Sequence, residues 1–111
     1  MAAYKDDVIQ EKLNLIKDSI LKAVPDTEAI YLFGSYVDGT PHKESDLDIC
    51  VIFPDSISNM LEVRGSIRNS LYRRLNIPMD LIVKKSTDFH NRKMSATLDR
   101  VIAESGVMIY G

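Results

Sequence analysis

Two aspartates, Asp46 and Asp48, stand at the start of an apolar run in the middle of this 111-residue chain. The run 46–53 reads DLDICVIF, which is typical of a β-strand. Because successive side chains of a strand alternate between its faces, both carboxylates are expected on one face, with their Cα atoms about 6.6 Å apart. Cys50 and Ile52 continue that face. The other face carries apolar side chains that suit a core: Leu47, Ile49, Val51 and Phe53.

A divalent cation is the simplest explanation for two carboxylates held side by side. Like charges at this spacing repel and raise each other's pKa unless a cation or hydrogen-bond donors compensate. Hard cations such as Mg²⁺ bind carboxylate oxygens. The alternative is an acid pair that is merely solvated at the start of a strand, because isolated Asp-X-Asp patterns are common.

The segment just before the two acids favours the cation interpretation. Residues 30–33 (IYLF) read as a strand that runs into Gly34 and Ser35, and Gly39 and Ser45 lie in the loop that follows. Glycines let a ligand approach the main chain closely, while a serine hydroxyl and free backbone N–H groups can hold a phosphate. The ordered combination of strand, Gly-Ser, glycine and acid pair is far more specific than any one of its parts.

A third acid, Asp80, lies in the apolar run 79–83 (MDLIV), which reads as another strand. Burying a carboxylate there is costly unless it is paired or binds a cation. We therefore interpret Asp80 as a further metal ligand rather than as an acid on an edge strand. Lys84 and Lys85 follow directly and are either solvated charges at the end of the strand or counter-charges for phosphate.

These residues together resemble the motif of the minimal nucleotidyltransferases, which are small members of the DNA polymerase β-like superfamily. The matching positions are Gly34, Ser35, Gly39, Ser45, Asp46, Asp48 and Asp80. The closing segment 105–111 (SGVMIYG) also looks like the ending of these proteins. The resemblance extends over most of the chain and implies the nucleotidyltransferase fold, an α/β (α+β) domain with a small mixed β-sheet flanked by helices.

The resemblance also implies an activity and its ligands. In that family the first two acids, here Asp46 and Asp48, hold two Mg²⁺ ions on ATP, and Mn²⁺ can substitute. The third acid, here Asp80, completes the catalytic site. The loop with its glycines and serine grips the phosphates of the nucleotide. This assigns nucleotide binding to Gly34, Ser35, Gly39 and Ser45.

Minimal proteins of this type are commonly paired with a small helical HEPN protein in a toxin–antitoxin system. The resemblance therefore implies an antitoxin that transfers AMP to a tyrosine of a HEPN partner, and a complex with that partner or with a second copy of the chain. Family members often carry an arginine in the glycine loop, where this chain has Tyr36, Val37 and Asp38. Because Asp38 adds negative charge near a triphosphate, the alternative is a catalytically weak or inactive protein that neutralises a partner by stoichiometric binding.

Apolar residues at three-and-four spacing predict three helices, over 7–24, from about 58 to 75, and over 86–105. Ser56 or Ser58 is the expected N-cap of the second helix and Ser86 or Thr87 that of the third, with Gly106 as its C-cap. The order helix, strand, loop, strand, helix, strand, helix predicts a single domain over 1–111 with a small mixed sheet.

Composition narrows the class of protein further. A formal net charge of −2 and a pI near 5.6 argue against bulk nucleic-acid binding. One cysteine in an apolar strand, no signal-peptide pattern and no apolar run of roughly 18 residues predict a cytoplasmic protein without a membrane segment.

His42 and His90 lack ligand spacing and are expected at the surface. Four arginines are either a solvated helix face or contacts for phosphate or an acidic partner: Arg64, Arg68, Arg73 and Arg74.

Overall fold

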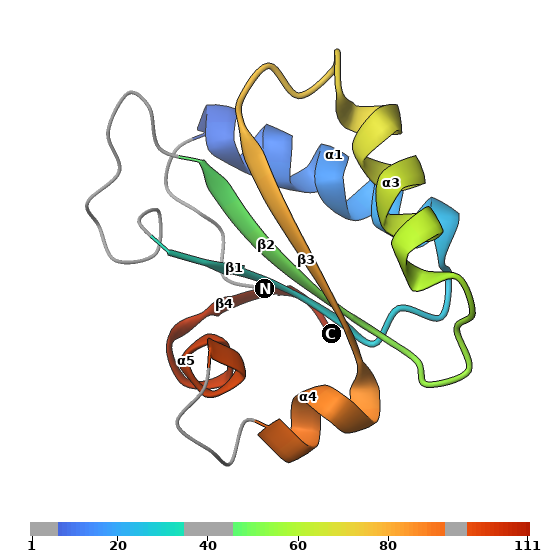
Figure 1. Ribbon diagram of the computed structural model, residues 1–111. Helices are drawn as coiled ribbons and strands as arrows, with labels where there is room; N and C mark the ends of the chain where they lie inside the picture. The colour runs from blue at the N-terminus through green and yellow to red at the C-terminus, as the bar shows by residue number, and fades with distance from the viewer. Residues whose placement is uncertain (1–6, 35–45, 93–97) are drawn as a thin grey trace.

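A four-stranded mixed β-sheet forms the centre of the protein, as a computed structural model shows for residues 7–34, 46–92 and 98–111 (Figure 1). The strand order is β3-β2-β1-β4. The bounds are β1 Ala29–Phe33, β2 Leu47–Phe53, β3 Met79–Lys85 and β4 Val107–Tyr110. β1 runs antiparallel to β2 and β4, whereas β2 and β3 are parallel. The predicted mixed sheet is therefore confirmed.

Helices lie on both faces of this sheet. α1 (Asp7–Ala23) and α3 (Met60–Leu71) cover one face, and α4 (Ser86–Arg92) and α5 (Leu98–Ser105) lie on the other (Figure 1). No helix among the described residues is long and apolar enough to cross a membrane.

The larger core lies between the sheet and the pair α1 and α3. α1 buries four side chains that recur every three or four residues: Ile9, Leu13, Ile16 and Ile20. They pack in one cluster with the alternate side chains of β2: Leu47, Ile49, Val51 and Phe53. Because a helix repeats every 3.6 residues and a strand every two, both stripes were readable in the sequence.

A smaller core covers the opposite face of the sheet. Its buried members are Ala29, Cys50, Ile52, Phe89 and Ile102. β2 is therefore packed on both faces, and the Cys50 thiol is buried. Asp48 lies on this same face, two residues before Cys50.

The expected helix over 86–105 is wrong, because α4 and α5 are separate helices whose axes point in different directions (Figure 1). Phe89 of α4 and Ile102 of α5 are buried in the same small cluster. On one straight helix, residues 13 positions apart would be about 20 Å apart. The two separate helices instead bring both side chains into this one cluster.

The last strand, β4, was not predicted. Its four residues VMIY are too short to show a period, and they form a strand because they pair with β1. Gly106 ends α5, as expected, and its N–H donates to the carbonyl of Ile102 at 2.9 Å. The chain can therefore pass from α5 directly into the sheet.

The ends of α3 differ from the prediction. Its N-cap is Asn59, with φ of 55°, and not Ser56 or Ser58. The helix ends at Leu71, and a turn then returns the chain, with the Leu75 N–H donating to the Leu71 carbonyl at 3.0 Å. Leu75 is nevertheless buried, because this turn points its side chain into the larger core.

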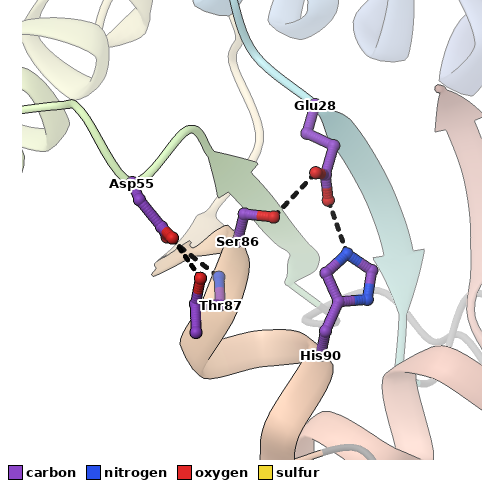
Figure 2. Close-up of polar contacts among 5 residues, drawn as sticks. All are labelled: Glu28, Asp55, Ser86, Thr87 and His90. Carbon is purple, nitrogen blue, oxygen red and sulfur yellow. Dashed lines mark hydrogen bonds and ion pairs between the residues drawn. The ribbon is translucent and has the colours of Figure 1, made fainter.

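The start of α4 is held by residues distant in the sequence (Figure 2). The Asp55 carboxylate accepts a hydrogen bond from the Thr87 N–H at 2.9 Å and another from the Thr87 hydroxyl. Glu28 accepts one from the Ser86 hydroxyl at 2.7 Å and contacts His90 Nε2 at 2.8 Å. Asp55 therefore does the capping that was expected of Ser86 or Thr87. His90 is exposed, as predicted, but it forms an ion pair with Glu28 when protonated.

Glu28→Gln is expected to lower stability at neutral pH, and the loss should disappear in acid. Hydrogen bonds from Ser86 and His90 lower the pKa of Glu28. A lowered carboxyl pKa stabilises the fold above the unfolded value of about 4.3, and this contribution is lost as the pH falls through the folded pKa. The effect should be at most about 1 kcal/mol because the pair is solvent-exposed.

Thermal unfolding from pH 7 to pH 3 measures this effect, with the exposed α3 residue Glu62 as control through Glu62→Gln. A constant difference between Glu28→Gln and the wild type across that range would contradict the assignment of the effect to the carboxylate charge.

Candidate active site

Asp48 and Asp80 are direct neighbours at the end of the sheet where β2 and β3 begin. The parallel register pairs Asp48 with Asp80, so both side chains project from the same face. The Leu47 N–H donates to the Pro78 carbonyl at 2.9 Å and continues this pairing toward the start of the two strands. Parallel pairing therefore brings together two acids that lie 32 positions apart in the sequence.

Asp46, immediately before β2, adds a third negative charge to this end of the sheet. Its side chain is exposed, as is that of Asp80, whereas Asp48 is half-buried. Burial raises the pKa of the Asp48 carboxyl, and the nearby charges of Asp80 and Asp46 raise it further. The charges of Asp80 and Asp46 thus act on the Asp48 carboxyl, and a bound cation would relieve this repulsion.

The main chain at the end of β1 lies directly against the Asp48 carboxylate. Phe33 pairs with Asp48 across the antiparallel ladder, and Gly34 follows with φ of 79°. A Cβ atom on Gly34 would lie 2.1 Å from Oδ2 of Asp48. Only glycine fits this position, because a side chain would displace the carboxylate and would also strain the left-handed backbone.

The chemistry of these donors fits Mg²⁺. Mg²⁺ usually binds one or two carboxylates and completes its octahedral shell with water and substrate phosphates. Asp48 and Asp80 supply two adjacent carboxylates, and Asp46 lies beside them. In the part of the chain that the structure describes, no group of three His, Cys, Asp or Glu side chains is already arranged as a metal site. Mg²⁺ held by these carboxylates would take further ligands from water and nucleotide.

Three of the predicted nucleotide-binding residues, Ser35, Gly39 and Ser45, lie outside the described residues, as does Asp38. Their roles stay predictions. Of the predicted set, the structure describes Gly34 and the three aspartates, and it places Gly34 against Asp48 and Asp48 beside Asp80.

Two half-buried apolar side chains share the face of the acids and were not singled out from the sequence. Phe33 pairs with Asp48, and Ile82 lies two residues after Asp80. Both pack against the smaller core. The period-two alternation of β1 and β3 was the signal that could have identified them as the apolar border of the site.

The structure shows where several basic residues lie and what two of them contact. Arg64 Nε donates to the Leu81 carbonyl at 2.6 Å, so this arginine ties α3 to β3. Lys12 of α1 donates from Nζ to the Leu75 carbonyl at 2.5 Å. Lys84 pairs with Ile52, four residues or about 13 Å along the ladder from Asp80. Arg64 and Lys12 therefore support the fold.

Comparisons with known proteins agree on one protein family. A family model described as "Polymerase beta, Nucleotidyltransferase" matches residues 14–111. The protein adenylyltransferase MntA of Shewanella oneidensis is 31% identical over 99 residues, which cover 89% of this chain and 62% of MntA. The chain therefore spans less than two thirds of the length of this relative.

Solved structures share the fold. A chain in the crystal structure of a toxin–antitoxin with AMP-PNP matches with a TM-score of 0.63 and 29% identity, over 88% of this chain and 72% of that chain. A chain in the structure of a tri-AMPylated Shewanella oneidensis HEPN toxin in complex with MNT antitoxin matches with a TM-score of 0.59 and 25% identity, over 92% and 71%. These matches confirm the predicted fold class.

Proposed function

Because the chain belongs to the polymerase β-type nucleotidyltransferase family, we propose that it is a Mg²⁺-dependent enzyme that transfers AMP from ATP to a protein hydroxyl. Its acceptor is a tyrosine of a HEPN-family partner, and the chain acts as the antitoxin of that pair. The observation that carries the proposal is the pairing of Asp48 with Asp80, beside Asp46 and against the glycine at the end of β1.

The proposed acceptor and partner are inferred from the relatives of this chain. MntA is a protein adenylyltransferase, and one matching structure holds an AMPylated HEPN toxin in complex with its MNT antitoxin. A buried thiol and the use of ATP fit the reducing cytoplasm as the site of this reaction.

In the proposed reaction, the tyrosine oxygen attacks the α-phosphorus of ATP. A bond forms between that oxygen and the phosphorus, the bond to the bridging oxygen of the β-phosphate breaks, and pyrophosphate leaves. Asp80, which is exposed beside Asp48, accepts the hydroxyl proton. Asp46 and Asp48, with Asp80, would hold two Mg²⁺ ions, which would supply charge stabilisation for the α-phosphate and the leaving group. Gly34, Ser35, Gly39 and Ser45 hold the outer phosphates.

The test is a reaction of the purified chain with ATP, Mg²⁺ and a HEPN-family protein from the same cell. Mass spectrometry should find AMP on tyrosines of the HEPN protein, with an equal amount of pyrophosphate released and no product when the metal is chelated. If the HEPN protein is inactivated in a stable complex but stays unmodified, the stoichiometric binder replaces the enzyme as the explanation.

A further inference from the structure

An exposed aromatic residue follows the last turn of α3. Tyr72 has 80% of its surface exposed, directly after Leu71, which is buried in the core. Tyrosine rings are enriched at protein interfaces, because the ring is apolar and its hydroxyl can hydrogen-bond. Tyrosine and arginine are also the residue types that are enriched where binding energy concentrates in protein interfaces.

Three exposed arginines surround this tyrosine in the sequence: Arg68, Arg73 and Arg74. Within the described residues, no carboxylate lies in ion-pair range of these three side chains. Favourable charge at the end of a helix explains Arg68 in part. It does not explain Arg73 and Arg74, which lie beyond the helix, or the exposed ring of Tyr72 just before them. Arg74 lines a separate hollow with Lys22 and Ser70. We call Arg68, Tyr72 and Arg73 the α3-end surface.

A groove of about 510 Å³ adjoins the α3-end surface. Apolar residues line most of it, and Arg68, Tyr72 and Asn76 contribute polar groups; the apolar residues are Leu71, Leu75, Ile77, Pro78 and Met79. The groove thus offers apolar side chains beside positive charge. Its shape and composition suit an apolar side chain of a partner that also carries carboxylates.

The position of the groove connects it with the candidate active site. Met79 lines the groove, and Asp80 is the next residue of β3. β3 is one of the two edge strands of the described sheet and lies next to β2 with its Asp48. A partner seated on the groove and extending around this edge would therefore reach the carboxylates.

We infer that the α3-end surface is the docking site for the acceptor protein, which presents acidic side chains to Arg68 and Arg73 and an apolar side chain to the groove. The identity of the occupant as acceptor rests on the proposed function. A protein is favoured over nucleic acid because the groove is lined by apolar side chains and the chain carries a net charge of −2.

The first test measures docking without catalysis. A fluorescein-labelled amphipathic peptide, with glutamates on one helical face and leucines on the other, is titrated with the full chain and followed by fluorescence anisotropy. We expect Arg68→Glu and Tyr72→Ala each to weaken binding about tenfold, and added salt to weaken it as well. Arg92→Glu, the same charge change on α4 across the sheet, should bind like the wild type. Unchanged binding by Arg68→Glu, or tighter binding of an oligouridylate of equal charge, would overturn the inference.

A second test separates docking from transfer. Asp48→Asn should bind the peptide like the wild type. With a HEPN-family acceptor, Arg68→Glu should raise the KM for that protein about tenfold without changing kcat or the KM for ATP. If the wild type transfers no AMP but its peptide binding depends on Arg68, the proposed function fails and the docking site stands. If transfer occurs and Arg68→Glu leaves the acceptor KM unchanged, the docking site fails and the function stands.

Discussion

Asp48→Asn should reduce nucleotidyl transfer at least about 100-fold and, in the absence of divalent cations, make the folded protein more stable. Activity falls because the neutral amide loses the negative charge that holds the ions beside Asp80. Stability rises because burial and the charges of Asp80 and Asp46 raise the pKa of the Asp48 carboxyl, so its charged form opposes folding near pH 7.

The sign of the pH dependence follows from that raised pKa. Below the ordinary carboxyl pKa of about 4, Asp48 is protonated in both the folded and the unfolded chain, and its carboxyl does not oppose folding. As the pH rises through the folded pKa, the carboxyl becomes charged and the free energy of unfolding falls. The advantage of Asp48→Asn should therefore be largest at neutral pH and shrink toward pH 4. Thermal unfolding in EDTA measures it, with Asp18→Asn, at an exposed position of α1, as the matched control. Undiminished transfer by Asp48→Asn would remove Asp48 from the site.

Gly34→Ala should damage both the fold and the activity. A Cβ atom there would lie 2.1 Å from Asp48 Oδ2, and φ of 79° disfavours any side chain. We expect a loss of roughly 1–3 kcal/mol in the free energy of unfolding and, because the carboxylate must move, a loss of about 100-fold in transfer. Chemical denaturation and the transfer assay measure the two effects.

Gly65→Ala is the matched control for this substitution. Gly65 lies inside α3, and a Cβ atom there would have nothing within 4 Å. Alanine should therefore stabilise the protein by about 0.4–1 kcal/mol and leave transfer unchanged. If both alanine variants behave alike, the close approach of Gly34 to Asp48 has no role in the site.

Local patterns predicted the parts of the fold that are built from regular repeats. α1 was readable because four apolar residues follow the helical period and are all buried. β2 was readable because its two faces differ in the sequence and separate into two cores. Asp46, Asp48 and Asp80 were recognisable in the sequence as candidate metal ligands. The parallel pairing of β2 and β3 then places Asp48 beside Asp80.

The features that sequence patterns missed depend on contacts between distant residues. β4 is a strand because β1 lies next to it. The separation of α4 from α5 follows from the shared burial of Phe89 and Ile102. Asp55 caps α4 from 32 positions away, where local propensity favoured Ser86 or Thr87. The contact between Gly34 and Asp48 arises likewise only once β1 and β2 are paired.

The most direct test of nucleotidyl transfer compares ATP labelled at the α-phosphate with ATP labelled at the γ-phosphate. Each is added, with Mg²⁺, to the chain in a lysate of its source cell. We predict that the α-label alone appears on a small protein, and that Asp46→Asn and EDTA each abolish this labelling. Transfer of the γ-label, or no transfer together with failure of the purified chain to bind Mg-ATP in calorimetry, would contradict it.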